Sequence, residues 1–527
     1  MNKMKRVFIP AIALLLAMVS CNKGDDDPRL IVITFDGLRW QEVFTGADSL
    51  LVGHPTFVTR PDTLTATYWR DTPEERREIL MPFTWSYIVK HGYLLGNRTI
   101  GSQMQVANEK WFSYPGYSED FCGYADNEHI ESNDAVPNPN TSVLEVANRD
   151  PRYKGKVMMY GGWLSTRFAV NNDRGGFPGS VAYEANLSSH QDETMQLLDE
   201  MLQGMPRIRP ENRYDAFNYA YAVETLKRDH PKVMWISFCE TDHWAHSDKY
   251  DFYIEAIRKT DYFIRRIVET CEADPYYKGK TTYLITCDHG RGKYKAFGSH
   301  GQGVYGSNQT WLMAFGKGVE RLGETSANGP FYNQQLAATI AAVLGIDFKP
   351  DNGVKQPPFD PHFKGEPIED AEPKTEMGHF PAINATPKGQ GVRYQYYEGN
   401  FQSVDELDKG KVVHSGILKN FSINSALQED HFGFIFKTLL KIPKSGKYNL
   451  TCTSDDGSKV WIDGKLVIDN DGSHGTNPME IYADLDQGYH RLEVKYFEDY
   501  EGQTFNIDLG GPDYAEDPIP YTMLYYE

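Results

Sequence analysis

The chain has 527 residues, which is long enough for two or three domains and at least one large buried core. A hydrophobic fraction of 40% and an aromatic fraction of 13% are typical of a globular protein and argue against a disordered one. The formal net charge of −19 argues against general nucleic-acid binding, which requires a basic surface, so no nucleic-acid partner is expected.

The N-terminus is interpreted as a targeting segment. A basic start precedes an apolar run over residues 7–19, which is too short to span a membrane. The run ends in Met-Val-Ser-Cys21, which resembles a bacterial lipobox and implies a lipoprotein signal peptide over residues 1–21, with cleavage before Cys21 and lipidation of its thiol. The acidic tether 22–28 resembles the export signals of surface lipoproteins in some Gram-negative bacteria. These resemblances imply an outer-membrane lipoprotein of the cell envelope, held to the membrane by its lipid anchor only; the alternative is a plain secretory signal with a chance cysteine.

The cysteines indicate neither a disulfide scaffold nor a thiolate zinc site. They are scattered and contain no Cys-x-x-Cys pair: Cys21, Cys122, Cys239, Cys271, Cys287 and Cys452. A zinc site in this chain would therefore have to use histidine and aspartate.

Short apolar runs alternate with segments of helical periodicity over residues 29–347. Strands are predicted at 31–33, 93–99, 156–161, 233–238, 281–286 and 310–315, and helices at 83–91, from about 113, 192–204, 213–229, 250–272 and 333–344. This alternation indicates an α/β domain whose mostly parallel sheet is covered by helices on both faces. The first strand runs into Asp36-Gly37, which puts a carboxylate at the carboxyl edge of the sheet, where open α/β folds carry their chemistry.

A second domain is predicted after a linker. Residues 348–389 are rich in proline and poor in apolar residues, so they should form an extended and semi-rigid linker. Residues 390–527 consist of short alternating runs separated by turn signals, which predict an antiparallel β-barrel or sandwich.

Aspartate and histidine residues gather after the predicted strands and in a glycine-flanked loop. They are Asp36, Asp242, His246, Asp288, His289 and His300. Asp242 and His246 are expected on one strand-to-helix loop. Each residue by itself could be a helix cap, a turn residue or a surface side chain. Six independent roles of this kind explain the ordered pattern less well than one shared metal site does. Carboxylate and imidazole ligands together suit zinc or a similar divalent ion, and this set suffices for two ions.

Ser113 is the candidate nucleophile. Pro115 suits the first turn of a helix, so Ser113 would lie at or just before a helix N-terminus. The helix dipole and a metal would both stabilise its alkoxide. Ser118 competes for the role, because it lies little more than one helical turn further on. Two metals about 4 Å apart are a known arrangement for in-line displacement at phosphorus.

Five motifs occur in the order used by a known family. FDGLR at 35–39, FSYPGYSE at 112–119, ETDHWAH at 240–246, DHGRG at 288–292 and SHG at 299–301 resemble the alkaline phosphatase superfamily, most closely its nucleotide pyrophosphatase/phosphodiesterase (type I phosphodiesterase) branch. The resemblance covers about residues 29–347. It implies that one zinc is held by Asp36, Ser113, Asp288 and His289, and the other by Asp242, His246 and His300. It also implies that Ser113 is the nucleophile and that Asn133 binds a nonbridging phosphate oxygen.

The motifs depart from that branch beside the nucleophile. Ser113 stands where the branch usually has Thr, and Tyr-Pro-Gly stands in place of Phe-Pro-Asn. These departures leave both monoesters and diesters open as substrates. The related sulfatases need a Cys/Ser-x-Pro-x-Arg motif for conversion to formylglycine; the sequence has no such motif, so sulfate ester hydrolysis is not expected as the main activity.

The C-terminal segment resembles a second family. Over about residues 390–515, the SDDGS turn at 454–458 and the following IDG hairpin are similar to the protective-antigen-like β-barrel domain. The resemblance implies carbohydrate binding, and calcium binding by Asp455 and Asp456. The alternatives are that the two aspartates only build a tight turn and that the domain is a spacer.

These observations predict a surface-anchored two-metal phosphohydrolase with two Zn²⁺ ions and a Ca²⁺ ion in the C-terminal domain. The favoured activity is a phosphodiesterase that works through a phosphoseryl intermediate on glycan-linked or nucleotide phosphodiesters. One alternative is a phosphomonoesterase of the same superfamily. An alternative of another class is a glycan-binding surface lipoprotein whose enzyme domain is inactive.

Overall fold

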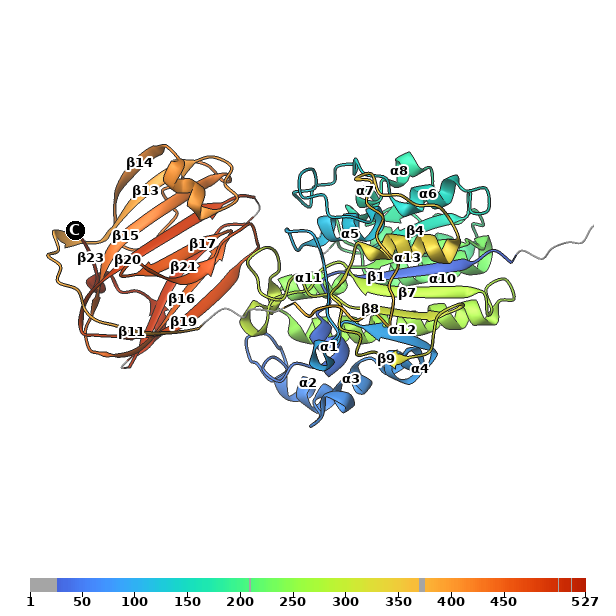
Figure 1. Cartoon of the computed structure of the whole chain (residues 1–527), viewed down its shortest axis with the longest axis horizontal. Helices are drawn as coiled ribbons and strands as arrows, with labels where there is room; N and C mark the ends of the chain where they lie inside the picture. Colours follow the sequence, from blue (N-terminus) through green and yellow to red (C-terminus); the bar gives the residue numbers. More distant parts are fainter. Residues whose placement is uncertain (1–25, 208–209, 369–374, 501, 513) are drawn as a thin grey trace, which may run out of the picture.

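The computed structural model describes residues 26–207, 210–368, 375–500, 502–512 and 514–527. An α/β domain comes first and a β domain follows it (Figure 1). Cys21 lies outside the described residues. None of the helices within these ranges has both the length and the apolar character needed to cross a membrane.

The first domain is built on one eight-stranded sheet. In spatial order its strands are β5 (Gly179–Val181), β4 (Val157–Gly161), β6 (Val233–Phe238), β1 (Arg29–Phe35), β7 (Thr281–Cys287), β8 (Leu312–Gly316), β2 (Gly92–Leu95) and β9 (Gly323–Glu324). Neighbours from β5 to β7 are parallel, whereas β8 is antiparallel to both β7 and β2. The predicted mostly parallel sheet is therefore confirmed.

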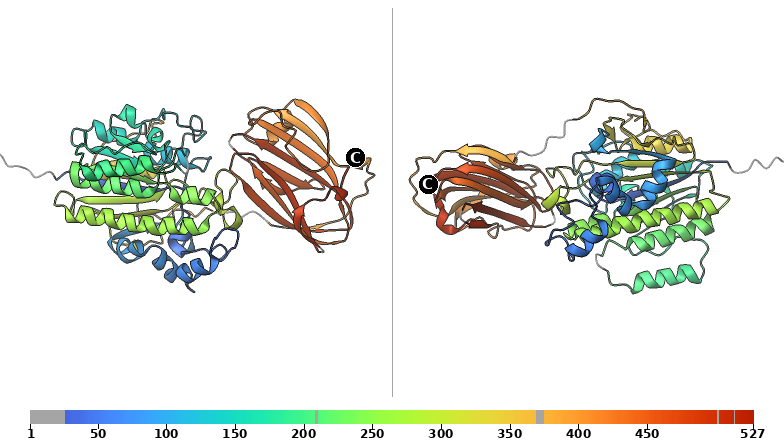
Figure 2. Two further views of the ribbon diagram at one scale, coloured as in Figure 1. Left: turned by 180° about the vertical axis from the view of Figure 1, so that it is seen from behind. Right: turned by 90° about the horizontal axis from the view of Figure 1, so that it is seen from below.

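Helices connect the strands and cover the sheet. They are α1 (Trp40–Thr45), α2 (Pro61–Tyr68), α3 (Pro73–Leu80), α4 (Val89–His91), α5 (Ser113–Cys122), α6 (Val143–Arg149), α7 (Thr166–Ala169), α8 (Asn172–Gly175), α9 (Glu193–Gly204), α10 (Asp215–Asp229), α11 (Glu240–His246), α12 (Tyr250–Ala273) and α13 (Gln335–Leu344). Figures 1 and 2 show α13 on one face of the sheet and α10 and α12 on the other.

The alternation of side chains along β1 explains why both faces are covered. Ile31, Ile33 and Phe35 pack in one core with α10 and α12, whereas Leu30 and Val32 pack in the other core with α5 and α13. A strand that is apolar at every position can only be buried between two helical layers. This burial fixes β1 in the middle of the sheet.

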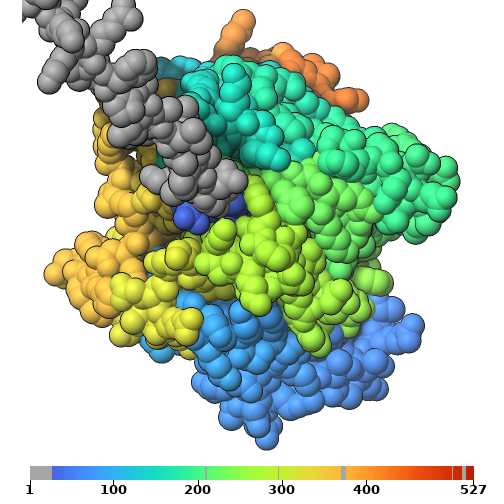
Figure 3. All heavy atoms as spheres, turned by 90° about the vertical axis from the view of Figure 1, so that its right-hand side faces the viewer, coloured from blue at the N-terminus to red at the C-terminus, as the bar shows by residue number. Residues whose placement is uncertain are grey.

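The proline-rich segment after α13 is more ordered than a simple linker. Phe348 and Phe359 are buried in the core that also contains α13, and Lys364 bridges to Gly329. In Figure 3 the yellow-to-orange segment that follows α13 lies against the α/β domain. Further on, β11 (Glu376–Phe380) pairs with the second domain. The predicted linker 348–389 therefore contributes to both domains, because its few aromatic side chains find apolar partners.

The second domain is a sandwich of two sheets. One has the order β11, β19 (Asn477–Leu485), β16 (Gly446–Asp455), β21 (Thr504–Gly511) and β22 (Tyr514–Pro518). The other has the order β12 (Gly389–Gln390), β23 (Leu524–Tyr526), β15 (Phe432–Ile442), β20 (Gly488–Glu498), β17 (Ser458–Ile462) and β18 (Lys465–Asn470), with β13 (Val392–Glu398) and β14 (Val412–Leu418) beside β15. All strand pairs are antiparallel except β11 with β19. Antiparallel β structure is confirmed; the described strands form a sandwich and no closed barrel.

Candidate metal centre

Three neighbouring strands bring the predicted site residues together. In the sheet β1 lies between β6 and β7, and Phe35 at its end is in register with Phe238 of β6 and Cys287 of β7. Neighbouring parallel strands lie about 4.8 Å apart. When they end at the same level, the residues that follow them lie close together at one edge of the sheet. Asp36 and Asp288 follow β1 and β7 directly, and α11 follows β6.

The first group of side chains surrounds His289 Nε2. Ser113 Oγ lies 3.2 Å from this nitrogen and 3.1 Å from Asp36 Oδ1. The same nitrogen is 3.3 Å from Asp36 Oδ1 and 3.7 Å from Asp288 Oδ2. Ligands of a tetrahedral zinc lie about 2.0–2.3 Å from the ion and so roughly 3.3 Å from one another. These four side chains are therefore spaced as the ligands of one metal ion would be.

The second group consists of Asp242, His246 and His300. Asp242 Oδ1 is 3.3 Å from His246 Nε2 and 3.4 Å from His300 Nε2, and the two nitrogens are 2.8 Å apart. Asp242 and His246 lie on α11, a short helix rather than the predicted loop. Residues i and i+4 of a helix point to the same side, which explains why both reach one point.

The two groups are adjacent. Ligand atoms of Asp242, His289 and His300 all lie within 4.8 Å of one another, as do those of Asp36, Asp288 and His289. The rings of His289 and His300 have centroids 4.1 Å apart. The arrangement has the compactness of a two-metal site, in which ions lie about 4 Å apart.

The charges of this centre favour a divalent cation. Burial and the neighbouring Asp242 raise the pKa of Asp36, and burial and Asp36 raise the pKa of Asp288 well above its usual value. Burial alone would lower the pKa of His289, but Asp288 and Asp36 raise it to about 9. The buried Asp288 Oδ2 has no hydrogen-bond partner within the described chain. Buried carboxylates that repel one another, with an unsatisfied oxygen between them, fit a metal ion.

Several residues that orient this centre were not predicted from the sequence. Asp288 Oδ1 accepts hydrogen bonds from the backbone nitrogens of Gly37 (3.0 Å) and His289 (2.9 Å), which turns Oδ2 toward His289. His289 Nδ1 lies 2.7 Å from the carbonyl oxygen of Gly290. Arg291 is fully buried and pairs with Asp242. The contacts of Gly37 with Asp288 and of Arg291 with Asp242 join residues that become neighbours only in the fold, so no spacing in the sequence indicated them.

Tyr117 holds the second oxygen of Asp36. Its hydroxyl donates to Asp36 Oδ2 at 3.2 Å and accepts from Ser237 Oγ at 3.2 Å. Tyr117→Phe is expected to weaken metal binding at the Ser113 group by about 10–100-fold, because partners that orient a ligand typically have effects of this size. Titration of the metal-free protein with zinc against a chromophoric chelator measures this change, and Tyr114→Phe is the matched control, since the Tyr114 hydroxyl donates to the Val136 carbonyl. Equal affinities in wild type and Tyr117→Phe would contradict the role.

Ser113 lies at the first position of α5. Phe112 precedes the helix in extended conformation, and Ser113 is 5% exposed. The rival Ser118 is further along the helix, where its Oγ accepts a hydrogen bond from Asn138 at 2.9 Å. Asn133 is exposed and its Oδ1 accepts from the backbone nitrogen of Tyr114 at 2.9 Å, which brings its side-chain amide to the same end of α5.

The C-terminal aspartates lie in a third acidic group. Ligand atoms of Asp455, Asp456 and Glu498 come within 4.8 Å of one another, and all three residues are buried. Asp456 Oδ1 accepts from the backbone nitrogen of His474 at 2.7 Å, and its Oδ2 accepts from that of Asp499 at 2.8 Å. Glu498 Oε1 has no hydrogen-bond partner in the described chain. Glu498 lies on β20, far from the SDDGS turn in sequence, and was therefore not predicted.

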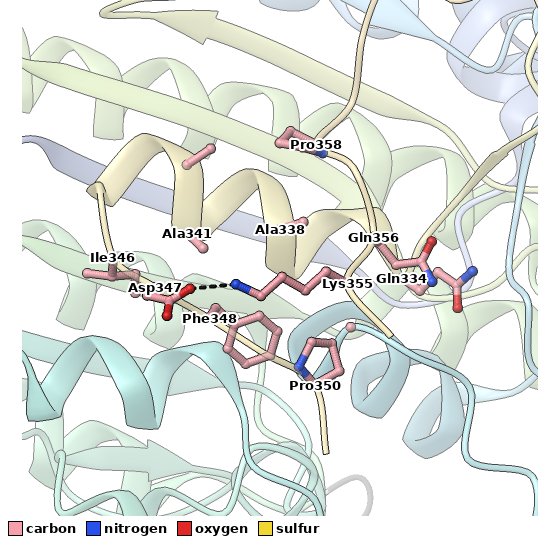
Figure 4. Close-up of a pocket in the computed structure, with 12 residues that line it drawn as sticks. Gln334, Ala338, Ala341, Ile346, Asp347, Phe348, Pro350, Lys355, Gln356 and Pro358 are labelled. Carbon is pink, nitrogen blue, oxygen red and sulfur yellow. Dashed lines mark hydrogen bonds and ion pairs between the residues drawn. The ribbon is translucent and has the colours of Figure 1, made fainter. Parts of the chain in front are cut away.

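A cavity of about 180 Å³ lies elsewhere, between α13 and the segment that follows it (Figure 4). Lys355 crosses it to pair with Asp347 at 2.6 Å. Its lining includes Gly123, which follows the last residue of α5, whereas Ser113 begins that helix. Ten helical residues span about 15 Å, so this cavity is separate from the metal centre.

Comparisons with known proteins support two domain assignments. Residues 159–302 match the Metalloenzyme superfamily and residues 389–522 match the PA14 domain. The first match contains five of the seven predicted metal-site residues: Asp242, His246, Asp288, His289 and His300. The chain thus contains a domain of the Metalloenzyme superfamily, which implies a divalent metal and hydrolase-like chemistry, followed by a PA14 domain.

Three solved structures to which the chain is similar are distant from it in sequence. A protein in the alkaline phosphatase superfamily from Vibrio parahaemolyticus is 12% identical over 61% of this chain and 67% of its own, with a TM-score of 0.37. A PA14 sugar-binding domain from an RTX adhesin is 18% identical over 26% and 99%, with a TM-score of 0.24. An anti-sigma factor domain-containing protein from Clostridium clariflavum is 20% identical over 30% and 53%, with a TM-score of 0.22, so this chain spans about half of its length. No curated protein matches the chain.

Proposed function

We propose that this protein is a surface-anchored two-metal phosphohydrolase of the phosphodiesterase branch, which works through a phosphoseryl intermediate. The observation that carries the proposal is the position of Ser113 Oγ, 3.1 Å from Asp36 Oδ1 and 3.2 Å from His289 Nε2, at the start of α5. A hydroxyl at ligand distance from a carboxylate and an imidazole is suited to activation by a metal. Anchoring at the outer membrane rests on the sequence around Cys21 alone.

The ligands are proposed in two sets. Asp36, Ser113, Asp288 and His289 would hold one zinc or similar divalent ion, and Asp242, His246 and His300 would hold the other. Bound there, the two ions would supply positive charge that favours ionisation of the hydroxyl and of the hydrolytic water and stabilises the leaving oxygen. Ser113 Oγ attacks phosphorus in line, so that an O–P bond forms as the bond to the leaving alcohol breaks. Water then cleaves the phosphoserine and restores the hydroxyl.

The chain itself orients the phosphate group. Ser113 begins α5, where the positive end of the helix dipole favours both its alkoxide and a bound phosphate. Asn133 uses Oδ1 to accept from the nitrogen of Tyr114, which leaves its Nδ2 group to donate to a nonbridging oxygen. Asn133 is therefore proposed as a phosphate-binding residue.

The hydrogen bonds of two buried arginines favour a diester substrate over a monoester. Arg291 is engaged by Asp242 and by the carbonyl oxygens of Phe297 and Gly298. Arg39 is likewise engaged by Glu42, Asp48 and the carbonyl oxygen of Gly292. A monoester has a second pKa near 6 and so carries nearly two charges at neutral pH, which a free guanidinium would bind bidentately. Because neither guanidinium is free, a singly charged diester suits the centre better.

Hydrolysis of bis-p-nitrophenyl phosphate beside p-nitrophenyl phosphate tests this function. Both are assayed with zinc, and with a chelator as control. Faster chelator-sensitive cleavage of the diester is expected and would direct the search to glycan-linked or nucleotide diesters. Faster cleavage of the monoester would replace the diesterase by a phosphomonoesterase. A purified protein without bound metal and without activity would favour the glycan-binding lipoprotein with an inactive enzyme domain.

The acidic group of the PA14 domain, formed by Asp455, Asp456 and Glu498, is proposed as a calcium site. The PA14 domain itself is proposed to bind carbohydrate. Burial and the charges of Asp456 and Asp455 raise the pKa of Glu498 to about 9, although a hydrogen bond from Tyr496 opposes this shift. The carboxyl group is then protonated at neutral pH without a cation. Calcium would displace the proton, because carboxylate ligands bind it in the ionised form.

The stability of the calcium-free protein is therefore expected to fall with rising pH. The pKa of Glu498 is about 9 when folded and about 4.3 when unfolded, so the folded state binds the extra proton between these values and loses stability as pH rises. The melting temperature of the β domain should be lower at about pH 8 than at about pH 5, and calcium should restore it at about pH 8. Glu498→Gln should weaken both the pH dependence and the calcium response. An unchanged calcium response in Glu498→Gln would contradict the site.

A further inference from the structure

The PA14 domain contacts the residues on both sides of the proposed metal ligand His300. Figure 1 shows it against the end of the α/β domain at which α11 lies. Gly301 forms an antiparallel bridge with His474, and Ser299 Oγ donates to the carbonyl oxygen of Gly475 at 3.1 Å. Ser299 and Gly301 are the chain neighbours of His300. Residues 471–475, which we call the docking loop, therefore pair with the backbone that carries a proposed metal ligand.

Glycines on both sides make this contact close. A β-carbon at Gly301 would lie 3.0 Å from His474 Cβ, and one at Gly303 would overlap the carbonyl oxygen of Asp471. From the other side, a β-carbon at Gly472 would lie 3.0 Å from Gln302 Cγ. The contact at Gly303 is closer than real β-carbons make, and the other two are tighter than most β-carbon contacts, so the two backbones approach more closely than most side chains would permit.

His300 has a particular need for this support. A metal-bound histidine is normally oriented by a hydrogen bond from its other ring nitrogen. His289 has that bond, because its Nδ1 lies 2.7 Å from the carbonyl oxygen of Gly290. In the described chain His300 Nδ1 is buried without a hydrogen-bond partner. The direction of the His300 ring therefore depends on its backbone, and that backbone is held by the docking loop.

The docking loop is itself firmly anchored in the PA14 domain. Asp456 Oδ1 accepts from the backbone nitrogen of His474 at 2.7 Å and from Ser473 Oγ at 3.0 Å. At the start of the loop, Asp471 accepts from the backbone nitrogen of Val404 at 2.8 Å and pairs with Lys459 at 2.8 Å. A loop held by the buried Asp456 and the partly buried Asp471 can transmit its position to the backbone that pairs with it.

We propose that the docking loop positions His300 and thereby sets the affinity of the second metal site. The proposal rests on the proposed function, because it takes His300 to be a ligand. Asp456 and His474 are positioning residues in this account, and Asp456 acts through the docking loop. The PA14 domain is then a structural part of the catalytic unit as well as a binding domain. A chain with a displaced docking loop should keep the Ser113-side metal and lose the other.

Asp456→Ala in the full chain tests the proposal. The variant removes the acceptor for His474 and Ser473, so we expect the second metal to bind about 10–100-fold more weakly and the first to bind normally. Titration with zinc against a chromophoric chelator resolves the two affinities, and no substrate is required. Asp463→Ala is the matched control, since its carboxylate accepts from the backbone nitrogen of Arg491 at 2.7 Å just beyond the other end of β17. Five strand residues separate the two ends by about 16 Å.

Each outcome decides the proposal. Equal second-site affinity in folded Asp456→Ala, Asp463→Ala and wild type would overturn it. If Asp456→Ala does not fold, Ser299→Ala decides, because it removes the hydrogen bond to Gly475 and leaves the PA14 domain unchanged. Normal second-site affinity in Ser299→Ala would then overturn the proposal, and a several-fold loss would support it. A wild-type protein that binds two metals but cleaves no phosphate ester would overturn the proposed function and leave this inference standing.

Discussion

Ser113→Ala is expected to lower turnover of bis-p-nitrophenyl phosphate by about 10⁴-fold or more, while the protein keeps both metals. The substitution removes the hydroxyl that is proposed to form the covalent intermediate. Three proposed ligands of the same ion remain, because His289 Nε2 lies 3.3 Å from Asp36 Oδ1 and 3.7 Å from Asp288 Oδ2. The measurement is kcat beside metal content by elemental analysis. Normal turnover would remove Ser113 from the mechanism.

Ser118→Ala is the control for this variant. Ser118 is buried on the same helix, but its Oγ accepts from Asn138, away from the metal ligands. Losing one such hydrogen bond costs about 1 kcal/mol of stability. We therefore expect a lower melting temperature with kcat unchanged. Turnover that is lost in Ser118→Ala and kept in Ser113→Ala would exchange the two roles.

Gly37→Ala is expected to disturb both metal sites at once and to reduce turnover by at least about 100-fold. Gly37 has a φ of +58°, and a β-carbon there would lie 2.7 Å from Arg291 Nη1 and 2.9 Å from His289 Cε1. The backbone nitrogen of Gly37 also donates to Asp288 Oδ1. An added methyl group must displace residues that reach the ligands of both ions. Zinc titration and kcat on the diester measure the effect.

Gly101→Ala separates this contact from backbone strain. Gly101 also has positive φ, at +83°, but nothing lies within 4 Å of a β-carbon built there. Its substitution should cost about 1–2 kcal/mol of stability for the left-handed conformation and leave metal binding intact. Equal effects of Gly37→Ala and Gly101→Ala on metal affinity would contradict the explanation that the added methyl group displaces Arg291 and His289.

The sequence alone determined the class of this protein and the residue types of its centre. Apolar strands followed by Asp36 or Asp288 are local signals, because burial on both faces requires a continuous apolar run and the chemistry follows its carboxyl end. The helix that begins at Ser113 was likewise predicted from Pro115, and the SDDGS turn from alternation and turn chemistry. Such signals depend only on residues that are neighbours in the chain, so they can be interpreted before the fold is known.

Only the tertiary structure decided which atoms meet. Strand register brings Asp36, α11 and Asp288 to one level, and the hydroxyl of Tyr117 reaches Asp36 across the sheet. Glu498 joins Asp455 and Asp456 from a different strand, and the docking loop meets the backbone around His300 from another domain. These contacts join residues far apart in the chain, and their geometry follows from packing whole layers together. No local pattern of charge or periodicity carries that information.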